Sequence, residues 1–461
     1  MMLTYVAAAF LAVVILLAMI GWGDILHRIL RLNDLRQWAV LGCTGFAFTT
    51  FAGGLLNLAG IISPLTVAAY LAIGFGATLL GRPDAGMPEG SLKRLSRAGL
   101  VIAIVAALLL SVRLLGSLVV LSPTATPVTF NVFDDFQGYF VYPEKMIRTG
   151  SMGFDPYSLR RTATHSLGGS AFLKSMVLTL GSEQNFYLLD AGLGSILTIG
   201  LILAWARRLG LTLAAALGVI LIFLAIPPPI YNTNSQLLTT AFFLTLFYVF
   251  PQTADEPDRL SRAALTGLLL AGICALRTNL IPAVFVFAAA NGLLAALRSG
   301  RKMRALLTAI LPFAFCILFL LPWLLDAWRW TGQPLPFSLH SYNAAPDFIA
   351  GYQKSNGWHS LPATIAGLPR IPYFVLAVLT LLVLPRLPRR SMEKQLFISA
   401  LTAAAIGSLA VLVGMGGFNA LARYVFPFLT ATILLAILLF RSVPHRTIAY
   451  TAAALALGVW V

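Results

Sequence analysis

The chain has 461 residues, of which 59% are hydrophobic and only 10% are charged. Soluble domains carry about 25% charged residues, so this chain has too few charges to cover a water-facing surface of its size. The composition therefore excludes a soluble enzyme, a disordered chain and a coiled coil. The apolar residues come in unbroken runs, which argues against a β-barrel and predicts an all-α, polytopic transmembrane helical bundle.

The formal net charge of +16 is sorted along the chain, and this sorting explains it without a nucleic-acid partner. Of the 32 Lys and Arg residues, 21 lie in one set of short loops between apolar runs and 10 lie in the other set. An excess of positive charge marks the cytoplasmic loops of membrane proteins. We therefore expect both ends of the chain to lie outside.

Segments of roughly 20 apolar residues predict membrane-spanning helices. The N-terminal run has neither a positively charged start nor a small-residue cleavage site, so we expect a first span rather than a cleaved signal peptide. About 12 to 14 spans are expected, because two of the runs are short enough to form one hairpin that does not fully cross. The apolar runs lie near 3–22, 38–62, 64–81, 98–122, 185–206, 210–227, 235–251, 263–276, 280–297, 304–327, 371–385, 395–415, 424–441 and 447–461.

The predicted cytoplasmic loops are short, whereas two predicted external stretches, 123–184 and 328–370, are long and rich in polar and aromatic residues. Binding and catalytic residues concentrate in long loops carried by a rigid scaffold. We therefore expect a three-helix membrane segment at 1–97, followed by a catalytic membrane module at 98–461 that carries both stretches. The aromatic residues of 328–370 would suit a carbohydrate surface, or equally an interfacial aromatic belt.

A pair of acids opens the first long stretch. Residues 134–149 can form an amphipathic helix in which Asp135, Tyr139 and Tyr142 share one face. Paired carboxylates near the membrane surface can deprotonate a hydroxyl or amine, or hold a metal that does so. Alternatively, Asp134 caps the helix and Asp135 complements its dipole. The pair is compatible with a divalent cation but does not require one, and no other cofactor is indicated.

Positive side chains also lie on the predicted external side, where a lipid phosphate would be found. Arginine binds phosphate through two parallel hydrogen bonds, although a single Arg at this depth can equally extend its head towards the headgroups. The candidates for binding the phosphate of a lipid are Arg160, Arg161, Arg277 and Arg423.

Polar residues of the external loops could contact a sugar or an acceptor. Asp155 and His165 lie in the first long stretch, and Asn232 and Asn234 lie in a short loop. A single His is more often a hydrogen-bonded structural residue than a base or ligand. The two Asn residues could instead cap the helix that is expected to start near Ser235.

Four short motifs lie on the same predicted side and follow one another along the chain. They are Asp134-Asp135-Phe-Gln-Gly-Tyr139, the stretch from Gly150 through Pro156 to His165-Ser-Leu-Gly-Gly169, WTGQPLPF at 330–337, and Arg423-Tyr-Val-Phe-Pro427. Over residues 98 to 441 the chain thereby resembles the GT-C superfamily of polyprenyl-phosphate-sugar-dependent glycosyltransferases. The likeness is to the branch that includes protein O-mannosyltransferases and aminoarabinose–lipid A transferases.

The chain departs from the family pattern in three ways. Many relatives have Asp-Glu where this chain has Asp134-Asp135, and the Pro-Pro that follows the family's His or Lys is absent after His165. Three predicted spans precede the span that leads into the acid loop, where many relatives have one. Residues 1–97 therefore have no counterpart in the resemblance.

The resemblance implies an inverting transfer of a sugar from a polyprenyl phosphate to an external acceptor. It assigns the base to Asp135, four residues before Tyr139, with Asp134 as the second choice. The acceptor would be a lipid-linked glycan, a glycolipid or a protein, and Tyr139 would help to bind the sugar or the acceptor. The expected location is a bacterial inner membrane, with the site on the periplasmic side. Two alternatives remain open: an O-antigen polymerase or ligase-like enzyme, and a transporter or lipid flippase.

Overall fold

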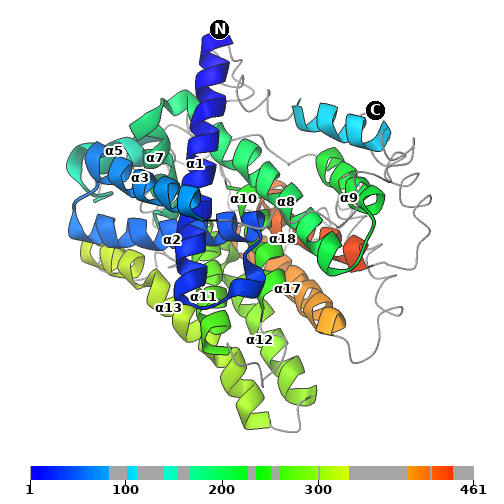
Figure 1. The fold of residues 1–461 in the computed structure, drawn as a ribbon. Helices are drawn as coiled ribbons and strands as arrows, with labels where there is room; N and C mark the ends of the chain where they lie inside the picture. Colours follow the sequence, from blue (N-terminus) through cyan, green and yellow to red (C-terminus); the bar gives the residue numbers. More distant parts are fainter. Residues whose placement is uncertain are drawn as a thin grey trace.

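The computed structural model describes residues 2–81, 101–111, 140–153, 167–226, 235–250, 259–298, 302–331, 392–415 and 418–439. These residues are helical apart from short turns and connections, and no β-strand occurs among them. The prediction of an all-α bundle is confirmed for this part of the chain (Figure 1). The predicted spans at 371–385 and 447–461 lie outside the described residues.

The first three helices pack closely on one another. They are α1 (Met2–Ile29), α2 (Trp38–Ala59) and α3 (Pro64–Leu80), and α1 contacts both of the others. Small residues allow this, since a Cβ at Gly45 of α2 would lie 1.8 Å from the carbonyl oxygen of Met19 in α1. Membrane helices approach closely through such residues. Ser63 caps α3 in a capping box with Thr66, which fixes where the third helix begins.

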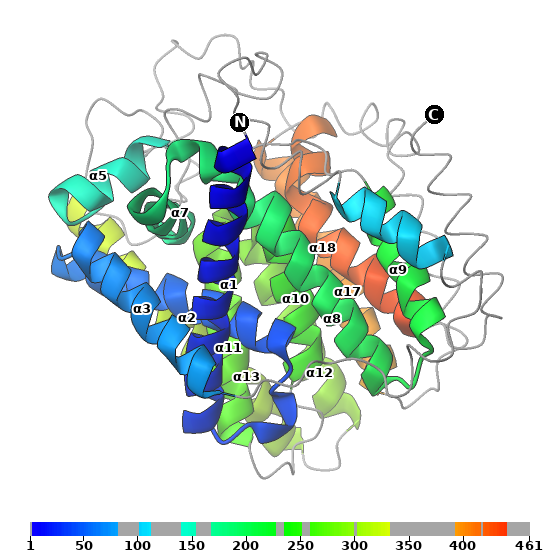
Figure 2. The same ribbon diagram turned by 45° about the horizontal axis from the view of Figure 1, so that its top comes forward.

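Two helices lie within residues 123–184, which were predicted to form one long external stretch. Helix α5 (Val141–Thr149) is the described part of the amphipathic helix predicted at 134–149, and it ends where predicted. Helix α7 (Gly169–Leu180) was not predicted. It is buried by contacts with α2, α3 and α5 (Figure 2), because Phe172, Leu173, Met176 and Val177 form an apolar face for those helices.

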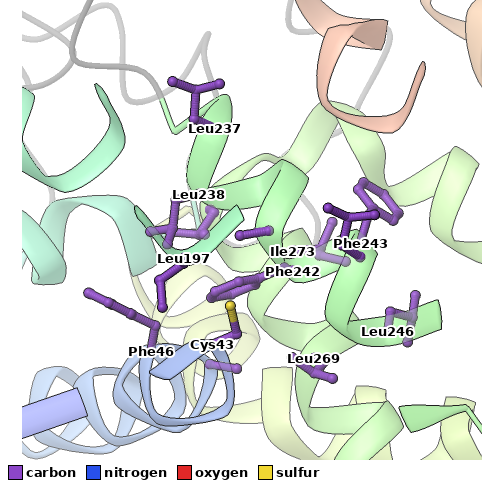
Figure 3. Close-up of a cluster of buried hydrophobic side chains, with 14 of the residues drawn as sticks. Cys43, Phe46, Leu197, Leu237, Leu238, Phe242, Phe243, Leu246, Leu269 and Ile273 are labelled. Atoms are coloured by element: carbon purple, nitrogen blue, oxygen red, sulfur yellow. The ribbon is translucent and has the colours of Figure 1, made fainter. Parts of the chain in front are cut away.

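The centre of the described bundle is α10 (Leu237–Val249), in which every residue is buried. It contacts α2, α8 (Ser195–Arg208), α11 (Arg259–Leu276) and α18 (Phe418–Leu439). Figure 3 shows the apolar side chains at this junction, among them Cys43 and Phe46 of α2, Leu197 of α8 and Phe242 of α10. All three cysteines are free and buried, as expected for small apolar residues.

The remaining described helices surround this centre. The short π-helical segment η5 (Leu188–Gly194) leads into α8, and α12 (Ile281–Arg298) packs against α13 (Lys302–Thr331) and α17 (Met392–Met415). Helix α9 (Leu213–Ala225) contacts α8 and α18. A described helix coincides with each predicted span outside 371–385 and 447–461, although only 101–111 of the predicted span 98–122 is described.

Four described helices are long and apolar enough to cross a membrane: Val6–Ile29, Trp38–Ala59, Glu183–Arg208 and Ile310–Trp330. The other apolar helices are shorter. Helix α13 exposes Ile310, Ile317 and Leu321 on its outer side, and an exposed apolar surface of this kind suits contact with lipid. The fold is therefore that of a helical bundle compatible with a membrane protein.

The bundle has two ends, which α8, α10 and α11 connect. We call one the Arg277 end, where Asp190 accepts a hydrogen bond from the first residue of α10, Leu237, and where Arg277 is buried. We call the other the Arg262 end, where Arg262 pairs with Asp34 and Arg208 donates to the carbonyl of Tyr248 at 2.7 Å. Each of these contacts joins segments that the charge distribution had assigned to the same side of the membrane.

Candidate functional site

Of the residues predicted for the site, Arg277 has a described side chain. Arg423 belongs to α18, but its side chain lies outside the described part of the structure. The other candidates lie outside the described residues, so their roles remain predictions. They are Asp134, Asp135, Tyr139, Asp155, Arg160, Arg161, His165, Asn232 and Asn234.

Arg277 is buried at a break between two helices. Helix α11 ends at Leu276, the backbone at Arg277 is extended with φ −146°, and a short 3-10 turn, η6 (Thr278–Leu280), leads into α12. Only 4% of Arg277 is exposed. The sequence had placed this residue at the headgroup interface, whereas the break in the helical hairpin turns it into the bundle. Arginine is rarely this buried without a partner of opposite charge.

The positive charge of Arg277 acts on Asp190, whose side chain is buried in the π-helical segment η5. One carboxylate oxygen, Oδ1, accepts hydrogen bonds from the backbone N–H of Leu237 at 2.7 Å and of Leu238 at 2.9 Å. Asp190 thereby caps the N-terminus of α10, where a negative charge also complements the helix dipole. The positive charge of Arg277 also acts on this carboxylate, so buried groups of opposite charge lie at the same end of the bundle.

The local sequence around Asp190 allows this approach. A Cβ at Gly194 would lie 2.5 Å from the backbone nitrogen of Leu238, so only glycine lets η5 and α10 come so close. π-helical turns are uncommon and occur frequently at functional sites. The π-helical geometry of this segment therefore replaces a regular α-helical turn, and it brings the carboxylate of Asp190 to the N-terminus of α10.

Other contacts at the Arg277 end join the described residues next to three predicted site segments. The hydroxyls of Ser170 and Ser235 lie 3.4 Å apart, and these residues follow the segments that contain His165 and Asn234. A Cβ at Gly168 would lie 2.3 Å from the ring of Trp323, a residue of the helix that leads into the second long stretch. The stems of all three segments are thus held together near the buried charge pair.

Two buried charged residues at this end, Asp190 and Lys174, are not among the predicted site residues. In the sequence, Asp190 either marks the outer end of a span or favours a transporter, because an acid within an otherwise apolar run is a signal of function. Lys174 of α7 had been counted only as an external cation. Its Nζ lies 5.9 Å from the centre of the Phe186 ring, and the residue is 2% exposed. Neither partner could be read from the sequence, because each lies on another element.

The described residues contain no group of three or more His, Cys, Asp or Glu side chains that could hold a metal ion. The acid pair at 134–135 lies outside that part of the chain. The described side chains therefore offer no cluster of ligands for a divalent cation. At the Arg277 end, the guanidinium of Arg277 is suited to electrostatic contact with an anion.

No family model, curated protein or solved structure matches this chain. The class of protein is therefore defined by its own fold and site. Its described residues form a helical bundle with several helices apolar and long enough for a membrane, and they bury Asp190 at the start of the central helix and Arg277 at the same end.

Proposed function

We propose that this protein is an integral-membrane glycosyltransferase that moves a sugar from a polyprenyl-phosphate donor to an acceptor at the membrane surface. The Arg277 end is the external, periplasmic end, and the protein resides in the inner membrane of a bacterium. The acceptor is a lipid-linked glycan, a glycolipid or a protein. The resemblance of the loop motifs to the GT-C superfamily is the basis for the chemistry.

The main structural support for the proposal is the burial of Arg277. This residue supplies a fixed positive charge at the end of the bundle to which the stems of the predicted acid and polar loops attach. Asp190 already accepts two backbone hydrogen bonds, so it does not depend on Arg277 alone, and a guanidinium has five N–H donors. Such a cation can stabilise the charge that develops on a leaving phosphate.

In the proposed reaction, Asp135 takes the proton from the acceptor hydroxyl or amine. The acceptor oxygen or nitrogen then attacks the anomeric carbon, and the bond from that carbon to the phosphate oxygen breaks. The electron pair stays on the polyprenyl phosphate, whose added negative charge is stabilised by Arg277, Arg423 and either Arg160 or Arg161. Attack from the face opposite the phosphate inverts the configuration of the sugar.

The test is native mass spectrometry of the purified protein, which asks for a bound polyprenyl phosphate or its glycosylated form. We expect Asp135→Asn to keep the lipid and to lower sugar transfer by about 10²- to 10⁴-fold, the usual contribution of a positioned base. A single Arg277 variant would remove the positive charge that acts on the buried Asp190. The double variant Arg277→Gln with Asp190→Asn removes both charges and is therefore the better probe of donor binding.

Loss of the lipid from the double variant, with Asp135→Asn unchanged in lipid content, would support the separate roles. A double variant that folds and binds the donor as well as the natural chain would contradict the role of Arg277. The variant Arg208→Gln at the Arg262 end serves as the matched control, because it removes a positive charge far from the proposed donor.

One observation favours a second function, transport or lipid flipping. Asp190 is an ionisable residue within the candidate span Glu183–Arg208, and π-helical geometry interrupts that span. Intramembrane charges and broken helices are features of transporters. Flux through proteoliposomes that is abolished by Asp190→Asn, and unaffected by Asp135→Asn, would favour transport over sugar transfer.

A further inference from the structure

The C-terminal half of α2 contacts three segments that lie far from it in the sequence. We call the residues that make these contacts the α2 anchor: Thr50, Gly53, Gly54, Asn57 and Gly60. The anchor belongs to residues 1–97, the part of the chain that has no counterpart in the GT-C resemblance. Its contacts show what this additional segment can contribute to the external loops.

The first contact is with residues 140–153, which follow the acid pair along the chain. Oδ1 of Asn57 accepts a hydrogen bond of 2.6 Å from the backbone N–H of Met152, and Asn57 is 1% exposed. The backbone N–H of Ile62 donates to the carbonyl of Gly150 at 3.0 Å. Two hydrogen bonds therefore attach the residues that follow α5: one to the last part of α2 and one to the turn between α2 and α3.

Gly150 shows how close this attachment is. Its φ is +86°, and a Cβ there would lie 2.2 Å from the carbonyl oxygen of Gly60. Any other residue would both strain the backbone and push the two turns apart. The fit between α5 and the α2 anchor therefore depends on the absence of a side chain at this position.

The second and third contacts are with α7 and α13. A Cβ at Gly53 would lie 2.2 Å from the ring of Phe172 in α7, and one at Gly54 would lie 2.9 Å from Nε1 of Trp323 in α13. That indole N–H donates to the carbonyl of Thr50 at 2.9 Å. The same half of α2 thus holds α7, which follows the first acid-bearing loop, and α13, which leads into the second long stretch.

We infer that the α2 anchor positions the two long external stretches relative to each other, and that Asn57 is a positioning residue for the loop of the acid pair. The effect on sugar transfer rests on the proposed function, whereas the attachment itself does not. Residue 140 follows Asp135 by only five positions, so release of 140–153 would move the base. A displacement of about 1 Å from a reactive geometry can cost about 10²-fold in rate.

Asn57→Leu is the variant that tests the anchor. It keeps a side chain of similar volume but removes the acceptor for Met152. It also removes the buried Nδ2 donor, which has no hydrogen-bond partner among the described residues, so we expect the bundle to remain folded. Asn57→Asp is the matched control, since it keeps an acceptor oxygen at the same place.

Hydrogen–deuterium exchange of the full chain in nanodiscs measures the attachment. We expect Asn57→Leu to speed exchange of the peptide that contains Met152 by about 10-fold, the worth of one buried hydrogen bond, and Asn57→Asp to restore most of the protection. In the transfer assay, Asn57→Leu should lower kcat by about 10- to 100-fold while KM for the donor stays unchanged, because Arg277 is untouched.

A glycine pair provides an independent test. Gly150→Ala and Gly153→Ala both place a side chain at positive φ, but a Cβ at Gly153 comes no nearer than 3.6 Å to its neighbours. We therefore expect faster exchange of 140–153 in Gly150→Ala than in Gly153→Ala. This pair decides the inference even if Asn57→Leu fails to fold.

Unchanged exchange of 140–153 in both Asn57→Leu and Gly150→Ala would overturn the anchor. Faster exchange with an unchanged kcat would overturn the positioning role of Asn57. Absence of any sugar transfer in the natural chain would refute the proposed function, and the exchange experiment would still decide whether α2 holds the loop.

Discussion

The two ends of the bundle handle charge in different ways. At the Arg277 end, Asp190 and Arg277 are both buried, and the carboxylate is held by backbone N–H groups of a third element. At the Arg262 end, the ion pairs include members that reach the surface, namely Arg28 and Asp34. Asp24 contacts Arg28 at 2.7 Å and Arg36 at 2.5 Å, and the side chain of Arg28 is 51% exposed.

The two ends differ in how much their charged groups cost in folding stability. An exposed ion pair adds little to stability and costs little, whereas a buried pair often stabilises less than apolar residues of the same volume would. The positive charges at the Arg262 end are explained by the excess of Lys and Arg in cytoplasmic loops and by their ion pairs with Asp24 and Asp34. The cap on α10 explains the burial of Asp190, and the proposed binding of an anionic group would explain the burial of Arg277.

The largest effect is expected from Asp190→Leu. This variant removes the acceptor for two backbone N–H groups of α10 and the negative charge on which Arg277 acts. We expect a loss of about 1 to 3 kcal/mol for each of the two buried backbone donors that is left without its acceptor. Thermal unfolding in detergent, followed by far-UV circular dichroism, would measure it.

Asp190→Asn is the control for that prediction. It keeps an oxygen that can accept from Leu237 and Leu238 but removes the negative charge, so its loss of stability should be clearly smaller. Equal losses in the two variants would show that the charge of Asp190, rather than its cap on α10, dominates. No loss in either would refute the contrast between the two ends.

An intermediate effect is expected from Asp24→Asn at the Arg262 end. The side chain of Asp24 is 4% exposed, and it accepts from Nε of Arg36 at 2.8 Å as well as pairing with Arg28. The arginines that lose their partner can turn towards water, so the cost should be about 1 to 3 kcal/mol, as for hydrogen bonds to charged groups. Arg28→Gln, which removes the more exposed partner, should cost less in the same unfolding assay. A loss in Asp24→Asn as large as that in Asp190→Leu would contradict the role of solvent.

The sequence predicted the helices well because their cause is local. The run from Trp38 is apolar and ends at Ala59 beside a left-handed Gly60, three residues before the predicted end. Helix α7 was missed because its stretch contains Lys174 and two serines and is too short for a span. It is buried through contacts with α2 and α3 that are distant in sequence, and those contacts could not be read from a periodic pattern.

The candidate site was predicted only in part, for a similar reason. The sequence showed that Arg277 follows an apolar run, but not whether its side chain would extend to the surface or turn inwards. Its burial depends on the break before η6, and Asp190, the carboxylate on which its charge acts, lies 87 positions away. Charge sorting predicted which loops share a side, because each loop obeys that rule independently. Pairing within a side depends on the packing of whole helices.

The smallest effect is expected from Asp34→Asn, which removes the ion pair with Arg262 at the Arg262 end. The side chain of Asp34 is 55% exposed, whereas that of Arg262 is 12% exposed. A carboxylate this accessible is screened by water and salt, so we expect a loss below about 1 kcal/mol that disappears near 1 M salt. Unfolding of Asp34→Asn and of the natural chain at low and high salt would measure this, with Asp190→Asn as the comparison. Asp190 is buried, so the effect of its variant should persist in salt. A salt-independent loss of several kcal/mol in Asp34→Asn would mean that this loop contact is as structural as the buried pair, and the distinction between the two ends would fail.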